Sequence, residues 1–86
     1  MTGQDMHTQQ KLAELFREVF ELDPNVGVAE MRYRDLPQWD SVGHMRLIAA
    51  IEQAYDIMLD TADVLDLSSF AKAVELLEKY GVDLTA

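Results

Sequence analysis

The sequence contains no cysteine, so neither a disulfide nor a thiolate metal site is available to it. Long apolar runs are also absent, because the longest one, residues 47–51, is far too short to span a bilayer. The first ten residues lack the apolar stretch of a signal peptide. We therefore expect a protein of the cytoplasm that has no membrane segment.

Basic residues are few: seven lysines and arginines stand against sixteen aspartates and glutamates, which gives a formal net charge of −9. Nucleic acids and anionic membranes bind proteins chiefly through lysine and arginine, so neither is expected as a partner. A protein with a basic surface is a better match, because opposite fields speed association. The acidity can equally serve only to keep a small domain in solution. Composition leaves both interpretations open.

The chain length of 86 residues provides for one compact domain, and 49% of these residues are apolar, which is enough for a core. We treat residues 1–86 as a single domain, with 1–6 as a loose N-terminal tail, and expect a monomer. So small a chain has little room for a deep catalytic cleft beside its fold. Its size therefore disfavours an enzyme.

Three segments carry apolar residues three and four positions apart, the pattern of helices with one buried face. The first ends at Asp23-Pro24, because the residue before a proline is driven out of the helical region. The second covers about 41–55 and the third about 69–81, with a short turn of helix at 61–66 between them. No segment alternates like a strand. The sequence thus predicts an all-α bundle of three main helices and one short helix.

Residues 24–40 form a long loop that contains both prolines. A loop of this length in a small domain is uncommon and is often functional. Four apolar residues are expected to hold the loop against the core: Val26, Met31, Tyr33 and Leu36. Helix caps are expected at Asp5 or Thr8, at Asp40 or Ser41, at Thr61, and at Ser68 or Ser69.

Ser41 is expected to be exposed at the N-terminus of the second helix, where the partial positive charge of the helix favours a phosphate. The simplest interpretation is an ordinary N-cap serine. A Ser-His-Asp nucleophile made of Asp40, Ser41 and His44 is disfavoured, since neither an oxyanion hole nor a G-x-S-x-G turn accompanies it. No metal site is expected, because His7 and His44 have no companion ligands at metal spacing.

Three short segments mark the start and end of the second helix and the start of the last one: Asp40-Ser41-Val42, Tyr55-Asp56-Ile57 and Ser68-Ser69-Phe70. They resemble the Asp-Ser-Leu, Phe-Gly-Ile and Ser-Phe segments of the acyl carrier protein family, with valine in place of leucine at 42. The resemblance extends from the first helix to Gly81. It implies a four-helix acyl-carrier-like bundle with no catalytic residues of its own.

The resemblance also implies a function. A phosphopantetheinyl transferase would move 4′-phosphopantetheine from coenzyme A onto Ser41, with Asp40 contributing to recognition by the transferase. The thiol of this arm would hold an acyl or aminoacyl group as a thioester and present it to acyl-loading, acyl-transferring or condensing enzymes. Fatty acid, polyketide and specialised pathways are all open. The alternative is an acidic helical interaction module that carries no prosthetic group.

The sequence departs from the family in its charges. Family members present acidic residues along the second helix, whereas this helix offers chiefly Glu52 and has His44 and Arg46 near the serine. We therefore expect an altered docking surface. The candidate partner contacts are Val42, Met45, Arg46 and Val64, although core packing competes for Met45. Trp39 is interpreted as cover for the loop, His44 as a surface residue, and the apolar space near Ile48, Ile51, Val64, Leu65 and Leu77 as filled core.

Overall fold

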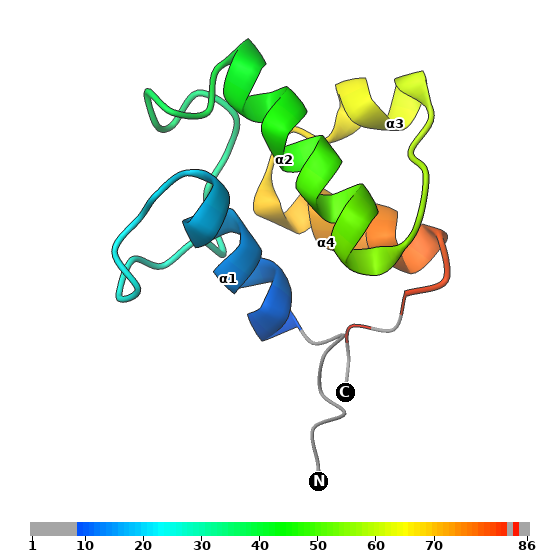
Figure 1. Cartoon of the computed structure of the whole chain (residues 1–86), viewed down its shortest axis with the longest axis horizontal. Coiled ribbons are helices and arrows are strands. Elements are labelled where there is room, and N and C mark those ends of the chain that lie inside the picture. The colour runs from blue at the N-terminus through cyan, green and yellow to red at the C-terminus, as the bar shows by residue number, and fades with distance from the viewer. Residues whose placement is uncertain (1–8, 83, 85–86) are drawn as a thin grey trace, which may run out of the picture.

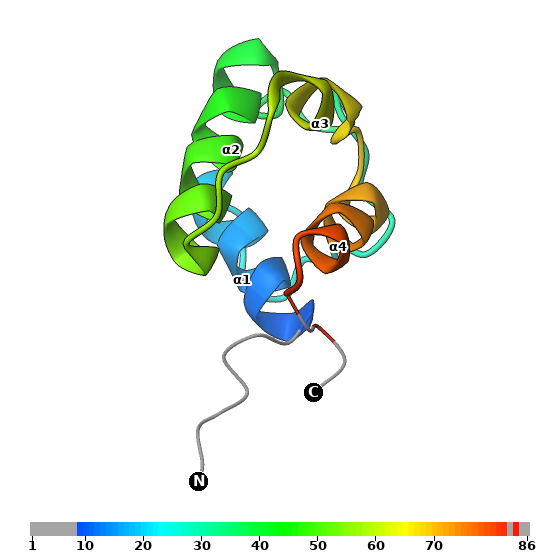
Figure 2. The same ribbon diagram turned by 90° about the vertical axis from the view of Figure 1, so that its right-hand side faces the viewer.

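The computed structural model describes residues 9–82 and 84. It contains four helices: α1 (Gln9–Val19), α2 (Ser41–Tyr55), α3 (Thr61–Asp66) and α4 (Phe70–Lys79). The long loop leads from α1 to the start of α2, and the short α3 lies between α2 and α4 in the chain and in space (Figures 1 and 2). The only β-pairing in the described residues is an isolated antiparallel bridge between Arg32 and Ser69. The prediction of an all-α four-helix bundle is confirmed.

Helix α1 ends four residues earlier than its proline predicts. Glu21 adopts a left-handed conformation with φ of 56°. The N–H of Leu22 then donates to the Arg17 carbonyl at 2.8 Å, and the N–H of Glu21 donates to the Glu18 carbonyl. These two bonds form a Schellman motif, which closes the helix without help from Pro24. The caps expected at Asp5 or Thr8 and the tail expected at 1–6 lie outside the described residues.

Helix α2 has the predicted boundaries. At its start Asp40 is the N-cap, and at its end Asp56 is left-handed with φ of 56°. The N–H groups of Asp56 and Ile57 both donate to the Glu52 carbonyl, so this end also closes on a left-handed residue. Asp56 occupies the position at which the family resemblance places a glycine, and its positive φ explains why a glycine suits that position.

The core is centred on an aromatic cluster that the loop completes. Trp39 has no exposed surface, stacks on Phe20 with ring centroids 5.3 Å apart, and meets Phe16 edge-on at 5.5 Å. The interpretation of Trp39 as mere cover was wrong, because its ring is part of the core itself. Val26 was also wrongly placed in the core, since it is exposed and Val28 is buried instead.

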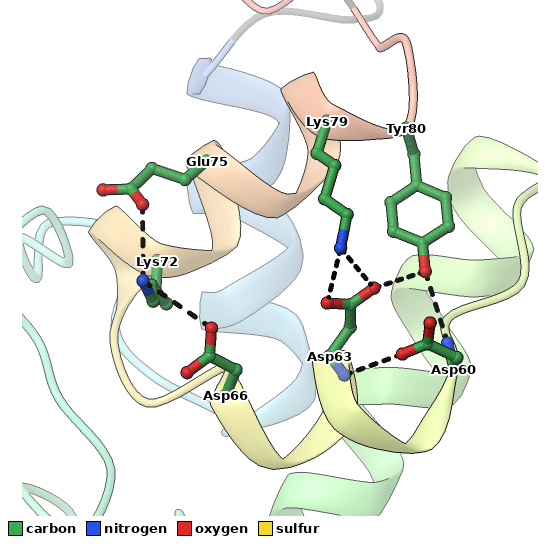
Figure 3. Close-up of polar contacts among 7 residues, drawn as sticks. All are labelled: Asp60, Asp63, Asp66, Lys72, Glu75, Lys79 and Tyr80. Atoms are coloured by element: carbon green, nitrogen blue, oxygen red, sulfur yellow. Dashed lines mark hydrogen bonds and ion pairs between the residues drawn. The ribbon is translucent and has the colours of Figure 1, made fainter.

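Helix α3 is attached to the bundle by a polar cluster rather than by apolar packing alone. Its N-cap is Asp60, not Thr61, and the Asp60 carboxylate accepts from the Asp63 N–H at 2.9 Å. The buried carboxylate of Asp63 binds Lys79 at 3.0 Å and accepts a hydrogen bond from the Tyr80 hydroxyl, both at the end of α4 (Figure 3). These bonds satisfy a carboxylate that would otherwise be costly to bury.

Acid should therefore destabilise the attachment of α3. The hydrogen bond from Tyr80, and then the one from Lys79, lower the pKa of Asp63 below its ordinary 3.8. A lowered folded-state pKa contributes stability that is present above the unfolded value and is lost as the pH falls through the folded one. Urea unfolding between pH 6 and pH 2 should show a steeper loss of stability below about pH 4 for the wild type than for Asp63→Asn. If the free energies of unfolding of the two proteins fell in parallel with pH, the Asp63 carboxylate would not be the group responsible.

Candidate functional site

Ser41 is the first residue of α2, and its side chain is exposed. The cap of the helix is provided by its neighbour, because Asp40 Oδ1 accepts the N–H of Gly43 at 2.9 Å. The N–H of His44 begins the helical ladder by donating to the Asp40 carbonyl. Ser41 therefore takes no part in capping, and its hydroxyl is available for chemistry.

The start of α2 is also a suitable place for an anion. The first N–H groups of a helix have no carbonyl partner inside the helix and carry partial positive charge. The Asp40 carboxylate accepts a hydrogen bond from the N–H of Gly43. The N–H groups of Ser41 and Val42 have no acceptor within the part of the chain that the structure describes. Two free donors therefore lie beside the Ser41 hydroxyl.

Gly43 lets the loop pass against the first turn of α2. A Cβ built on Gly43 would collide with the carbonyl oxygen of Gln38, a backbone atom that has no rotamer by which to move away. This close approach brings Trp39 into the core and Asp40 into its capping position. A glycine in the first turn of a helix predicts only a weaker helix, so this packing role cannot be read from the sequence.

We expect Gly43→Ala to destabilise the domain by about 1–3 kcal/mol, the range for added volume at a tightly packed position. Gly27→Ala is the matched control, because nothing lies within 4 Å of the Cβ that it would add. Thermal unfolding of both variants beside the wild type measures the difference. Equal melting temperatures for the two variants would show that the loop yields easily at Gln38.

A cleft of about 310 Å³ lies beside Ser41, between the start of α2 and α3. It is lined by eight residues: Tyr33, Ser41, His44, Met45, Val64, Leu65, Leu67 and Ser68. Five apolar residues were predicted to fill the core in this region. Three of them, Ile48, Ile51 and Leu77, are indeed buried there. Val64 and Leu65 instead line this cleft. The lining offers apolar carbon with a few hydroxyl groups, and this suits a ligand with a flexible, largely apolar chain.

His44 is not the surface residue that the sequence suggested. Its Nδ1 accepts the Trp39 indole N–H at 3.0 Å, and its Nε2 lies 2.8 Å from the Val64 carbonyl oxygen. Both ring nitrogens are therefore engaged, and neither is left to accept a proton from Ser41. This arrangement removes the structural basis for a Ser-His-Asp nucleophile.

The comparisons with known proteins agree with this geometry. Residues 10–77 match the family model described as phosphopantetheine attachment site. The chain belongs to this family. No curated protein and no solved structure matches the chain significantly.

Membership fixes the general role of the protein. It is a phosphopantetheine carrier, whose prosthetic group is covalently attached 4′-phosphopantetheine and which performs no catalysis itself. Within residues 9–82 and 84, no helix has both the length and the apolar character that crossing a bilayer requires. The same residues contain no cluster of three side chains able to hold a metal ion.

Solvent-exposed apolar side chains surround Ser41 of the carrier. Val42 is 68% exposed, Met45 56% and Leu65 79%. Met45 is thus no core residue, so the competing interpretation of core packing was wrong. Leu65, which was expected to face inward, points outward because α3 buries Asp63, two residues earlier on the opposite side of the helix. No local pattern indicates this, since Asp63 is buried through its bonds to α4.

The exposed face of α2 on this carrier bears no carboxylate. Its single acid, Glu52, is half-buried and accepts the Leu59 N–H at 2.9 Å, so it supports the link to α3. Arg46 is exposed and donates to the Val19 carbonyl at the end of α1. The exposed face of α2 beyond Ser41 is therefore apolar with one positive charge, although the exposed Asp40 adjoins the serine and the chain as a whole is strongly acidic.

Proposed function

We propose that Ser41 carries the phosphopantetheine arm, and that the arm holds acyl or aminoacyl groups as thioesters for partner enzymes. The observation that supports this most directly is the exposed, uncommitted hydroxyl of Ser41 between two free N–H groups and an apolar cleft. The prosthetic group fits these residues. The N–H groups of Ser41 and Val42 would hold phosphate oxygens, and the cleft would accept apolar parts of the arm or its cargo.

The attachment requires little of the carrier itself. The Ser41 oxygen would form the new bond to phosphorus, the nucleotide part of coenzyme A would leave, and the hydroxyl proton would pass to a base of the transferase. Asp40 would present its exposed carboxylate to the transferase while its Oδ1 keeps the cap on α2. Once loaded, the arm replaces diffusion of free intermediates by a high local concentration.

The test is to incubate the purified protein with coenzyme A and a broad-range phosphopantetheinyl transferase, and to measure its intact mass. A gain of one phosphopantetheine group, located on the peptide that contains Ser41, would support the proposal. An unchanged mass, together with modification of a known carrier in the same tube, would instead favour an acidic interaction module. An arm located on another residue would refute the assignment of Ser41.

The docking surface that we propose consists of Val42, Met45, Arg46 and Val64. Val42 and Met45 are exposed beside Ser41, Val64 lines the cleft, and Arg46 contributes a positive charge. The partners would be the transferase and the acyl-loading, acyl-transferring or condensing enzymes of a fatty acid, polyketide or related pathway. We expect the carrier to act as a monomeric single domain in the cytoplasm. Its partners should present an apolar depression bordered by acidic side chains, which complements this surface.

Reversal of the charge at Arg46 tests the docking surface. Arg46→Glu should lower kcat/KM for at least one partner enzyme by roughly three- to tenfold, because charges at the rim of an interface mainly change the rate of association. Arg46→Gln, which removes the charge without reversing it, should have an intermediate effect. The differences should shrink in about 1 M salt, where charges are screened within about 3 Å. Unchanged rates with the transferase and with the loading enzyme would exclude Arg46 from docking.

A further inference from the structure

His44 connects two of the segments that border Ser41. It bonds to Trp39, two residues before the serine, and to the backbone of Val64 in α3. Its ring also lies edge-on to Tyr33, with centroids 5.5 Å apart. Because Tyr33 and Val64 line the cleft together with Ser41, one imidazole contacts both sides of the site.

The two partners determine where the ring carries its hydrogen. The Trp39 indole N–H is only a donor, so Nδ1 must offer its lone pair. The Val64 carbonyl is only an acceptor, so Nε2 must carry the hydrogen. The neutral tautomer with hydrogen on Nε2 satisfies both bonds at once, and the other neutral tautomer satisfies neither.

Helix α3 depends on this bond at its C-terminal end. A helix of six residues leaves most of its last carbonyls without partners inside the helix. The N–H of Leu67 donates a hydrogen bond to the Asp63 carbonyl, while no backbone N–H in the described residues donates to the Val64 carbonyl. His44 provides the missing donor. Its bond holds the C-terminal half of α3 to α2, and the bonds of Asp63 hold α3 to α4.

We infer that His44 is a positioning residue that sets the width of the cleft by holding α3 to the segment that carries Ser41. Its two hydrogen bonds keep Val64, which lines the cleft, and the buried Trp39, which precedes the serine, at a fixed separation. If α3 moves outward, the Nε2 hydrogen loses its acceptor and the ring that accepts from Trp39 is free to turn. The order of the serine segment is thereby linked to the placement of α3.

Two substitutions separate the two bonds. In His44→Asn, the amide oxygen can take the place of Nδ1 and accept from Trp39, but nothing reaches Val64. In His44→Gln, the amide nitrogen can take the place of Nε2 and donate to Val64, but the acceptor for Trp39 is lost. His44→Ala removes both. The probes are hydrogen exchange of the Trp39 indole N–H and of two α3 reporter amides, Val64 within the helix and Leu67 at its C-cap, measured by NMR on the unmodified protein.

We expect His44→Gln to accelerate exchange of the indole N–H by roughly five- to tenfold and to leave the α3 amides slow, since one hydrogen bond is lost. His44→Asn should give the opposite pattern, and His44→Ala should accelerate both. The ring ¹⁵N resonances of the wild type should show hydrogen on Nε2 and a lone pair on Nδ1. If the ring only fills space, the exchange rates of His44→Asn and His44→Gln will both resemble those of His44→Ala. That result, or hydrogen on Nδ1, would overturn the inference.

The consequence for modification rests on the proposed role of Ser41. The KM of a broad-range phosphopantetheinyl transferase for the carrier should rise about three- to tenfold in His44→Gln with kcat little changed, because a looser serine segment must be ordered on binding. His44→Asn should raise KM less than His44→Gln. A larger KM for the His44→Asn protein than for the His44→Gln protein would refute the link between His44 and the serine segment. A wild type that no transferase modifies would refute the role of Ser41, while the exchange data would still decide the role of His44.

Discussion

Ser41→Ala should lose phosphopantetheine attachment completely and should fold as well as the wild type. The loss is complete because the modification needs an oxygen nucleophile at this position, and alanine has none. The fold is unaffected because Ser41 is exposed and because Asp40, not Ser41, caps α2. The change in the free energy of unfolding should lie within about 0.5 kcal/mol, as for other surface positions.

The measurement is an intact mass after incubation with transferase and coenzyme A, paired with a thermal unfolding curve. Ser68→Ala is the matched control, since Ser68 is an exposed serine that lines the same cleft. It should gain the full mass of one arm. An arm that persists in Ser41→Ala, or that is lost in Ser68→Ala, would move the attachment site elsewhere.

Trp39→Ala should destabilise the domain by about 3–5 kcal/mol, the cost of removing a large aromatic side chain from a packed interior. The indole has no exposed surface and packs against Phe16 and Phe20 of the first helical segment. Native proteins are typically stable by only about 5–15 kcal/mol, so this one change removes a large part of the total. In a domain this small, we expect a substantial unfolded population at 37 °C.

Urea titration followed by circular dichroism measures this loss. Trp39→Phe is the informative companion, because it retains an aromatic ring in the core but loses the indole N–H that bonds to His44. It should cost less than Trp39→Ala. A stability of Trp39→Ala within about 1 kcal/mol of the wild type would mean that the aromatic cluster does not depend on the loop.

The sequence predicted α2 well because both ends of this helix carry local signals. Asp40 is a capping residue, and the Tyr55-Asp56-Ile57 segment marks the end through its resemblance to a known pattern. The end of α1 was missed because the left-handed residue there is Glu21, a residue type that does not signal a helix end. Local patterns locate a helix terminus only when its residues are typical of that terminus.

The surroundings of Ser41 were less predictable, because they depend on contacts between distant segments. The engagement of both His44 nitrogens requires Trp39 and Val64, which approach each other only in the folded chain. The outward position of Leu65 follows from the burial of Asp63, and that burial requires Lys79 and Tyr80 of a later segment. Helical periodicity assigns an acid to the outside and a leucine to the inside, and here the ion pair reverses both.

The position of Trp39 has one further practical consequence. It is the only tryptophan of the chain, and its indole lies in the core with its N–H bonded to His44, two residues from Ser41. Indole emission responds to the polarity and hydrogen bonding around the ring. The native fluorescence of this carrier is therefore an internal, label-free optical signal from the immediate neighbourhood of its serine. Stopped-flow mixing with a partner enzyme can use that signal to time events at the site without any attached dye.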